Sequence, residues 1–373
     1  MSGYDHGHDE RMMARAAALA RAVRRRTAPW PAVGCVIAGP GAIVGEGATG
    51  DFPTGPHAEP AALAAAGEAA RGATAYVTLE PCDHHGNTPP CTEALIAAGV
   101  SRVVIACTDP DERVAGRGER RLRDAGIDVT VGVGGREVAE DLAPYLHHRR
   151  TGRSFVTAKV AMSLDARVAA ADGTSQWITG PEARADAHEL RADVQAVVIG
   201  SGTALADGPA LTVRGVADPP REPPRRVLLD GRGRVPPAGP LFDGSAPTLV
   251  VTTGAASAMA VNGWRRAGAD VATVPGGPGG LDLGAVLTRL GAEGVLHALV
   301  EGGGDLLGSV VAGGWADRLV AYVAPLVLGI DGRPAFGSRG PGTLADAPRY
   351  GLRSATVVGA DVRLYYTCRP EED

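Results

Sequence analysis

The chain has 373 residues, of which 45% are hydrophobic and 21% charged, and this length and composition predict a globular protein of two domains. The formal net charge of −5 and the aromatic content of 4% argue against a nucleic-acid surface. No apolar run has the length that a membrane span requires. The odd number of cysteines, five, does not make a disulfide framework, so we expect a cytoplasmic protein with reduced thiols.

The N-terminal half alternates between helical and β-like patterns. Apolar residues recur near helical spacing over 10–26, and two β-like runs flank Gly39-Pro40-Gly41, which predicts a hairpin. In chain order we expect helix 10–26, strands 33–38 and 42–46, helix 57–71, strand 76–79, a helix from Cys91 to Gly99, strand 102–106, helix 117–125 and strand 128–133. A hairpin followed by alternating helices and strands predicts a three-layer α/β/α domain.

A basic stretch near Tyr145–Arg153, YLHHRRTGR, marks the boundary between the halves. We interpret its two histidines and two arginines at 147–150 as a solvated linker rather than a binding patch. The predicted domains are therefore 1–148 and 149–373. In the second, strands are expected at 155–162, 196–200, 226–230, 248–252, 295–300, 318–323 and 361–367, and helices at 181–192, 283–291 and after Gly304.

The clearest chemical pattern joins Pro56-His57-Ala58-Glu59 to the segment YVTLEPCDHHGNTPPCT at 76–92. Two thiolates, Cys82 and Cys91, and the imidazole of His57 suit a tetrahedral zinc ion and leave its fourth position for water. Glu59, two residues after the histidine, supplies the proton shuttle that such a water needs. His-x-Glu followed by Pro-Cys and a later Cys is the signature of zinc deaminases.

The same residues also allow a structural zinc site or two unrelated core cysteines. Structural sites usually have four protein ligands and tight Cys-x-x-Cys spacing, whereas eight residues separate Cys82 from Cys91. The His-Ala-Glu triplet also favours the catalytic interpretation. His84 and His85 lie in the same loop, and we interpret them as loop or substrate contacts.

Two segments of the second half have possible chemistry. Val300–Asp305, VEGGGD, predicts a strand end, a glycine turn and a helix start, where backbone amides can approach a phosphate, although an ordinary turn gives the same pattern. Glu301 ends an apolar strand, so its carboxylate needs a partner. The other segment, Gly173–Thr179, predicts a loop before a helix, with Thr179 as a possible N-cap.

With these motifs the chain resembles the bifunctional deaminase–reductases of riboflavin biosynthesis. HAE at 57–59 and LEPCDHHGNTPPCTEALIAAGV at 79–100 resemble the deaminase half. The segments AKVAMSLDARVAAADGTSQWIT, LRADVQAVVIGSGTALADGPALTVR and LVEGGGDLLGSVVAGG resemble the reductase half. The resemblance implies a cytidine-deaminase-like α/β/α domain followed by a dihydrofolate-reductase-like α/β domain, and homodimers or higher homo-oligomers formed through the reductase domain.

The resemblance also implies two reactions on a phosphoribosyl-pyrimidine. The first is hydrolytic deamination of 2,5-diamino-6-ribosylamino-4(3H)-pyrimidinone 5′-phosphate, with zinc on His57, Cys82 and Cys91 and proton transfer by Glu59. The second is NADPH-dependent reduction of the ribosyl group to ribityl, with Lys159 near the ribose. The implied NADPH contacts are Ala161, Trp177, Thr203, Asp207, Gly303, Gly304, Asp305, Leu306, Leu307, Gly308 and Ser309. The implied substrate contacts are Ser175, Arg191, Leu211, Arg214 and Glu301.

Four positions depart from the family pattern. Trp30 and Ala32 stand in Pro-Trp-Pro-Ala-Val-Gly where the family often has Pro-Asn-Pro-Asn-Val-Gly, so the amide that would hydrogen-bond the pyrimidine is missing at Trp30. Gly208 and Ala166 replace an aspartate and a glycine in the reductase half. The alternative is therefore a paralogue that acts on a related pyrimidine or pterin intermediate, with both halves or only one half active. A non-catalytic zinc-stabilised binding protein and a nucleic-acid-editing deaminase are further alternatives, and Glu59 and the acidic balance count against them.

Overall fold

The computed structural model describes residues 6–85, 89–277, 280–337 and 340–368, and the chain divides into two compact units, Met1–Gly152 and Arg153–Asp373. Each unit is described by itself. Within the described ranges, no helix combines the length and the apolar character needed to cross a membrane.

The first unit is a five-stranded sheet in the order β2-β1-β3-β4-β5. Its strands are β1 Gly34–Gly39, β2 Ala42–Ala48, β3 Thr74–Leu79, β4 Arg102–Cys107 and β5 Asp128–Val131. Its helices are α1 His6–Thr27, α2 Ala58–Ala66, α3 Cys91–Ala98, α4 Arg117–Asp124, α5 Gly135–Asp141 and α6 Ala143–Thr151, with a short 3-10 turn at Gly67–Ala70. The hairpin of β1 and β2 is antiparallel, as predicted, and β3, β4 and β5 run parallel.

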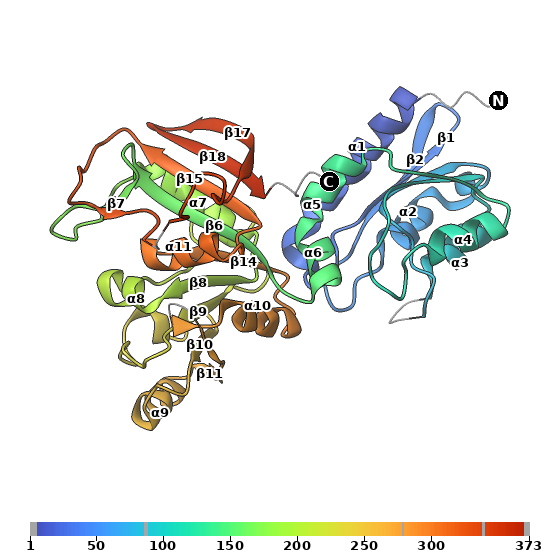
Figure 1. The fold of residues 1–373 in the computed structure, drawn as a ribbon. Coiled ribbons are helices and arrows are strands. Elements are labelled where there is room, and N and C mark those ends of the chain that lie inside the picture. The colour runs from blue at the N-terminus through green and yellow to red at the C-terminus, as the bar shows by residue number, and fades with distance from the viewer. Residues whose placement is uncertain (1–5, 86–88, 278–279, 338–339, 369–373) are drawn as a thin grey trace. The chain divides into compact units, whose positions relative to one another are not determined.

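Helices cover both faces of this sheet, which confirms the predicted three layers. Figure 1 shows α1, α5 and α6 on one side of the strands and α2, α3 and α4 on the other. Glycines on the strands allow the helices to approach the backbone closely. A Cβ atom on Gly34 would overlap the carbonyl oxygen of Ala16 in α1, and one on Gly47 would overlap that of Ala58 in α2. The close contact of α2 with β2 fixes where the helix begins, and His57 and Glu59 lie at that end.

The second unit is built on a nine-stranded sheet in the order β11-β10-β9-β8-β14-β6-β15-β18-β17. Its strands are β6 Phe155–Ser163, β8 Ala196–Gly200, β9 Arg225–Leu229, β10 Thr248–Thr252, β11 Asp270–Thr273, β14 His297–Glu301, β15 Arg318–Ala324, β17 Tyr350–Val358 and β18 Asp361–Cys368. The strands from β11 to β15 are parallel, and β18 and β17 continue the sheet in antiparallel pairing.

Helices and short strands complete this unit. They are β7 Arg167–Ala169, α7 Pro181–Ala192, α8 Ser201–Asp207, the 3-10 turn Pro240–Phe242, α9 Ala258–Arg266, β12 Gly276–Gly277, β13 Gly280–Leu281, α10 Leu283–Ala292, α11 Gly304–Ala312 and β16 Arg333–Pro334. Alternate residues of the central strands enter two hydrophobic clusters, with Val198 and Val300 in one and Val197 and Leu299 in the other. This two-sided burial is typical of parallel strands covered on both faces.

Two sequence-based expectations are wrong. The segment expected to be a solvated linker is mostly helix α6, because Tyr145 and Leu146 are buried and hold its basic residues against the unit. Thr179 is not the N-cap of α7. That position is taken by Gly180, whose N–H donates to Asp361 Oδ2 at 2.7 Å. The structure also contains elements that the patterns did not predict, namely α5, β7, α8, α9, β11, β12, β13, β16, β17 and the 3-10 turn Pro240–Phe242.

Candidate active sites

Three side chains expected to hold a metal meet in the first unit. His57 immediately precedes α2, Cys82 follows β3, and Cys91 is the first residue of α3. His57 Nδ1 lies 3.3 Å from Cys91 Sγ and 3.7 Å from Cys82 Sγ, and the three ligand atoms lie within 4.8 Å of one another. Zinc bonds of about 2.0 Å to nitrogen and 2.3 Å to sulfur, at tetrahedral angles, separate N and S by roughly 3.5 Å. The donor set therefore fits a zinc ion in both chemistry and spacing.

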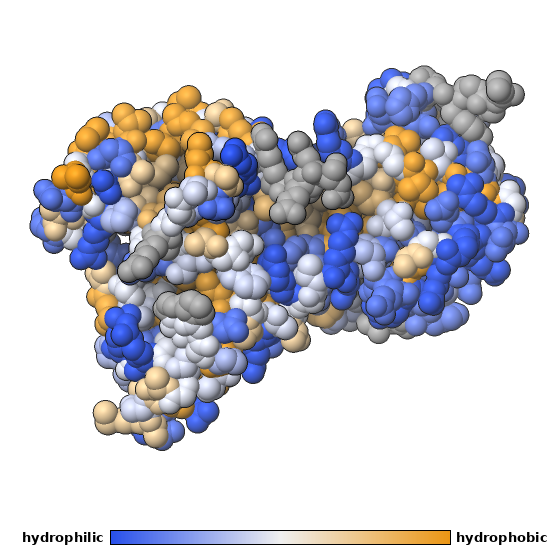
Figure 2. Space-filling model, in the orientation of Figure 1, coloured by the Kyte–Doolittle hydropathy of each residue, from blue (hydrophilic) through white to orange (hydrophobic). Residues whose placement is uncertain are grey.

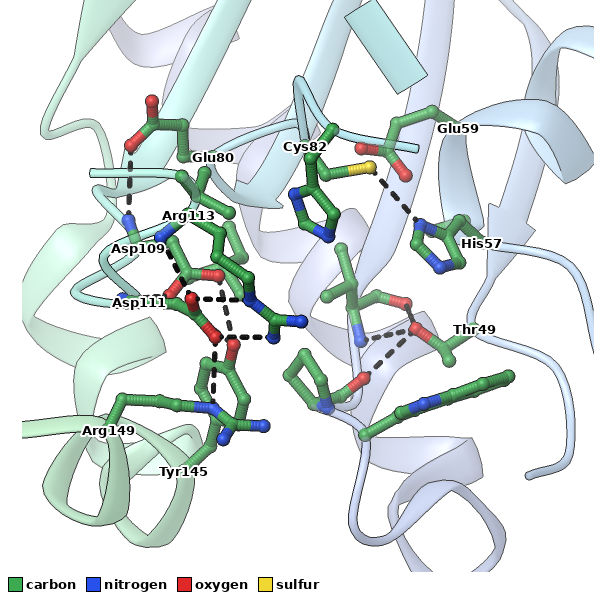
Figure 3. Close-up of a pocket in the computed structure, with 17 residues that line it drawn as sticks. Thr49, His57, Glu59, Glu80, Cys82, Asp109, Asp111, Arg113, Tyr145 and Arg149 are labelled. Carbon is green, nitrogen blue, oxygen red and sulfur yellow. Dashed lines mark hydrogen bonds and ion pairs between the residues drawn. The ribbon is translucent and has the colours of Figure 1, made fainter. Parts of the chain in front are cut away.

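Glu59 lies beside this trio but is not one of its three ligand groups. It is in the first turn of α2 and only 4% exposed. Burial, and next the neighbouring Cys82 thiolate, raise the pKa of Glu59 to about 7. Its carboxylate lies near the sulfur of Cys82 (Figure 3). A buried carboxyl group with a raised pKa next to a metal-ligand cluster is suited to exchange protons.

His57 and Cys82 of the trio line a cavity of about 260 Å³, and Trp30 lines it too. The Trp30 ring meets those of Phe52 and His57 edge to face, with centroids 5.0 Å and 6.1 Å away. The departure from the family pattern at Trp30 is therefore located in the pocket. His84 also lines this cavity, whereas the exposed His85 lies 3.8 Å from Glu93. Residues 86–88 of the predicted metal loop fall outside the described residues.

The opposite wall is polar and was not predicted. It consists of Asp109, Asp111, Arg113, Tyr145 and Arg149. Arg113 donates from Nε and Nη2 to Asp111 at 3.0 and 2.8 Å, and Arg149 Nε lies 3.5 Å from the same carboxylate. The Tyr145 hydroxyl donates to Asp109, whose pKa is raised by burial.

The buried Glu80 holds the loop that carries Asp109, Asp111 and Arg113. This carboxylate accepts backbone N–H groups of Asp109 at 3.3 Å, Gly116 at 3.0 Å, Gly118 at 3.0 Å and Glu119 at 3.3 Å. Glu80 follows β3 and Asp109 follows the neighbouring parallel strand β4. Polar residues just after two adjacent parallel strands reach the same edge of the sheet, and this signal could have located Asp109, although not Tyr145 or Arg149, from the sequence.

In the second unit, Arg191, Glu301 and Lys159 come together. Arg191 binds both oxygens of Glu301, at 2.6 and 2.9 Å, and Lys159 Nζ lies 4.0 Å from Glu301 Oε2. Lys159 and Glu301 face each other in the register of β6 and β14, which explains their proximity. Burial lowers the pKa of Lys159 and is opposed by the charge of Glu301. Lys159 also lies over the Tyr322 ring, 5.7 Å from its centroid.

The glycine turn after Glu301 begins α11. Gly302 has a φ of 152°, a conformation that L side chains rarely adopt, and the Gly303 N–H donates to Thr203 Oγ1 at 2.9 Å. The turn and Thr203 are thus brought together, as the NADPH assignment requires. Within α11, Asp305 is exposed, Leu306 and Ser309 are half-buried, and Leu307 and Gly308 are buried.

The other residues assigned to the reductase site lie in separate contacts. Ser175 Oγ donates to Asp207 at 3.3 Å. Trp177 is 67% exposed, with the Arg184 guanidinium 4.5 Å from its ring centroid. The exposed Arg214 donates its backbone N–H to His188 Nδ1 at 3.2 Å. Leu211 is buried with a φ of 52°, and Ala161 is half-buried on β6.

Comparison with known proteins agrees with this arrangement. A family model described as the cytidine and deoxycytidylate deaminase zinc-binding region matches residues 6–107, and one described as the RibD C-terminal domain matches residues 154–364. The riboflavin biosynthesis protein RibD of Escherichia coli K12 is 43% identical over 370 residues, covering 96% of this chain and 98% of its own. The chain belongs to the RibD family.

Solved RibD structures have the same fold. One from Acinetobacter baumannii matches with a TM-score of 0.88 and 36% identity, over 98% of this chain and 100% of that one. Another, from Thermotoga maritima, is described as a diaminohydroxyphosphoribosylaminopyrimidine deaminase/5-amino-6-(5-phosphoribosylamino)uracil reductase. It matches with a TM-score of 0.85 and 31% identity, over 98% and 100% of the two chains.

As a RibD family member, the chain is a deaminase and a reductase of riboflavin biosynthesis, with zinc in its deaminase domain and NADPH as the cofactor of its reductase domain. The bifunctional assignment made from the sequence is thus confirmed over the paralogue alternative.

Proposed function

We propose that the two RibD reactions take place at two separate sites, one in 1–148 and one in 149–373. The observation that carries this proposal is that two independent sets of functional side chains assemble, each inside its own unit. In the first unit, His57, Cys82 and Glu59 line one pocket, and Cys91 completes the metal-ligand cluster there. In the second unit, Lys159, Arg191 and Glu301 form a cluster.

In the first unit, His57, Cys82 and Cys91 would hold zinc and Glu59 would move the protons. When bound, zinc lowers the pKa of a coordinated water and so supplies the nucleophile of a hydrolytic deamination. Glu59 accepts a proton and donates it to the departing amine, and its raised pKa near 7 suits both steps. Trp30 offers an apolar face to the pyrimidine ring.

In the second unit, the glycine turn and Thr203 fit a phosphate-bearing cofactor. The turn leaves backbone at the start of α11 without side chains, and helix N-termini favour anions. When bound, NADPH supplies the hydride that reduces the ribosyl group. We assign its contacts to Ala161, Trp177, Thr203, Asp207 and the segment from Gly303 to Ser309.

The substrate of the reductase site would meet Ser175, Arg191, Leu211, Arg214 and Glu301. Among the described residues, Arg191 uses three N–H groups on Glu301 and Thr212, which leaves two for a ligand. Lys159, held between Glu301 and Tyr322, is placed to deliver a proton to the ribose. Glu301 orients both cations.

Single variants of each site test the division. Glu59→Gln should strongly reduce deamination and leave reduction of the deaminated intermediate intact, and Lys159→Met should do the reverse. Loss of both reactions in either folded variant would contradict two separate sites. Each variant alone should fail to complement a riboflavin auxotroph, while the two co-expressed should restore growth.

We also propose that the chain acts in the cytoplasm as a homodimer formed through the second unit. Strand β17 ends the nine-stranded sheet, and its residues Leu352 and Val357 are 55% and 76% exposed. Figure 2 shows apolar surface over β17 and β18. A second copy of this edge would bury it. Light scattering measures the mass in solution of the wild type and of Val357→Glu. The wild type should be a dimer and the variant a monomer, and a monomeric wild type would contradict the proposal.

A further inference from the structure

The polar wall of the deaminase pocket has two guanidinium groups that the proposed reaction does not yet use. Arg113 and Arg149 line the pocket on the side away from His57 (Figure 3). The substrate of the proposed deamination carries its ribose phosphate on a different ring atom from the amine that leaves. When that amine lies at the metal ligands, the phosphate therefore points away from them.

Arg113 has hydrogen-bonding capacity left for a ligand. Its Nε and Nη2 atoms donate to Asp111, while Nη1 donates no hydrogen bond to any described residue. Its side chain is 65% exposed, and its guanidinium group extends toward the open centre of the pocket (Figure 3). A guanidinium gripped on one edge by a carboxylate presents its other N–H groups in a fixed direction.

Arg149 adds a second cation to the same place. It lies over the Tyr145 ring at 5.0 Å and beside Asp111, and its buried Nε makes no hydrogen bond in the part of the chain that the structure describes. Asp111 therefore forms ion pairs with both Arg113 and Arg149. The other carboxylate, Asp109, accepts from the Tyr145 hydroxyl and the Asp111 N–H and makes no ion pair with either arginine among the described residues.

We propose that Arg113 and Arg149 bind the 5′-phosphate of the substrate in the deaminase pocket, with Asp111 fixing their positions. This inference rests on the proposed function, because it assigns one end of the same pocket. The ligand class is a phosphate monoester of a ribosylated pyrimidine. Asp109 and Asp111 line the same wall, but Asp111 is engaged by Arg113 and Asp109 by the Tyr145 hydroxyl, so Arg113 Nη1 is the donor available to a phosphate.

Deamination kinetics of the full-length zinc-loaded protein test the assignment. Arg113→Gln and Arg149→Gln should each raise KM about tenfold, as expected for a lost charge-assisted hydrogen bond, with kcat changed less than twofold. Ribose 5-phosphate should inhibit the wild type competitively and the double variant at least tenfold more weakly, whereas ribose should inhibit neither. Arg120→Gln is the matched control, because Arg120 is exposed nearby and does not line the pocket.

A purely structural cluster would give a different result. In that case the variants would lower the melting temperature and leave both KM and the inhibition by ribose 5-phosphate unchanged, and the inference would be overturned. Failure of the wild type to deaminate would contradict the proposed function instead. Calorimetric titration with ribose 5-phosphate still tests the assignment in that case. The number of binding sites per chain should fall by one in Arg113→Gln/Arg149→Gln, and an unchanged number would refute the assignment.

Discussion

Arg191 on α7 and Glu301 at the end of β14 are joined by two hydrogen bonds, from Nε to Oε1 at 2.6 Å and from Nη2 to Oε2 at 2.9 Å. Burial alone would raise the pKa of Glu301, but the charge and hydrogen bonds of Arg191 and the charge of Lys159 lower it. The carboxylate therefore stays ionised in a buried position and holds two cations at one end of the parallel sheet.

Arg191→Met should destabilise the second unit by about 3 kcal/mol, because it leaves a buried carboxylate with only Lys159, at 4.0 Å, as a partner. Denaturant unfolding measures the change. The double variant Arg191→Met/Glu301→Met should recover most of the loss, since no unpaired charge remains. Equal destabilisation by the single and double variants would show that packing, and not charge, dominates.

Glu59→Gln should keep about one zinc per chain while deamination falls by about 10² to 10⁴, the usual contribution of a general acid–base group. The reason is that, among the described residues, the clustered metal-ligand atoms come from His57, Cys82 and Cys91 and not from Glu59. Metal analysis and kinetics of the same preparation check both parts. His57→Ala is the control and should lose zinc and activity together, whereas zinc loss from Glu59→Gln would make Glu59 a ligand.

Trp30→Ala should weaken substrate binding by roughly 1–3 kcal/mol, the range for stacking of a base on an aromatic ring. Trp30→Asn should retain more activity than Trp30→Ala, because an amide can hydrogen-bond the pyrimidine. Since Trp30 also touches His57, zinc content must be measured alongside the steady-state constants. Unchanged kcat and KM in Trp30→Ala would mean that the indole does not meet the substrate.

His297 should make the stability of the protein fall as the pH drops below neutral. Burial, and next the charge of Arg318, lower the pKa of His297 from 6.5 to about 3. The unfolded chain takes up a proton near pH 6.5 and the folded chain does not until about pH 3, so the stability is fully present above pH 6.5 and is lost between these values. The slope from this group is about 1.4 kcal/mol per pH unit.

Unfolding of His297→Gln between pH 4 and 7 measures this contribution. The variant should show a shallower pH dependence than the wild type, since its side chain does not titrate. His6→Gln serves as the control because His6 is exposed. Parallel curves for His297→Gln and the wild type would show that another group causes the acid sensitivity.

A fragment of residues 1–152 should bind zinc and deaminate, because it contains the pocket and all of α6. A fragment that ends at Asp141 lacks Tyr145 and Arg149, two residues of the pocket wall, and should deaminate poorly even when zinc is bound. Zinc analysis and kinetics on both fragments distinguish the cases. A folded, zinc-loaded but inactive fragment 1–152 would show that the two halves share one site.

The metal trio was accessible from the sequence because its chemistry depends on residue type and spacing. His57 lies at the start of one helix, Cys82 follows a strand, and Cys91 begins a second helix. Local sequence patterns predict the start of both helices. The strands at Thr248–Thr252 and Ala196–Gly200 agree with the predicted ranges, since apolar β-branched runs bounded by polar residues are local signals.

The polar wall was missed because its members come from two distant segments. Arg149 belongs to a run whose charge suggested a solvated linker, and only the packing of Tyr145 shows otherwise. Likewise, the partner of Glu301 could not be identified from its own segment, because Arg191 lies 110 positions away on α7. Contacts between segments so far apart in the sequence depend on the topology of the fold, which local sequence patterns do not encode.

The way in which Glu80 fastens the loop after β4 has a consequence for how this pocket can diversify. All four of its hydrogen-bond donors are backbone N–H groups, two of them on glycines. The Glu80 anchor therefore does not depend on the side chains of exposed loop residues such as Glu112 and Arg113. Substitutions along it can change the charge and size of the pocket wall while its path over the site persists, so new substrate preferences can arise there without loss of the fold.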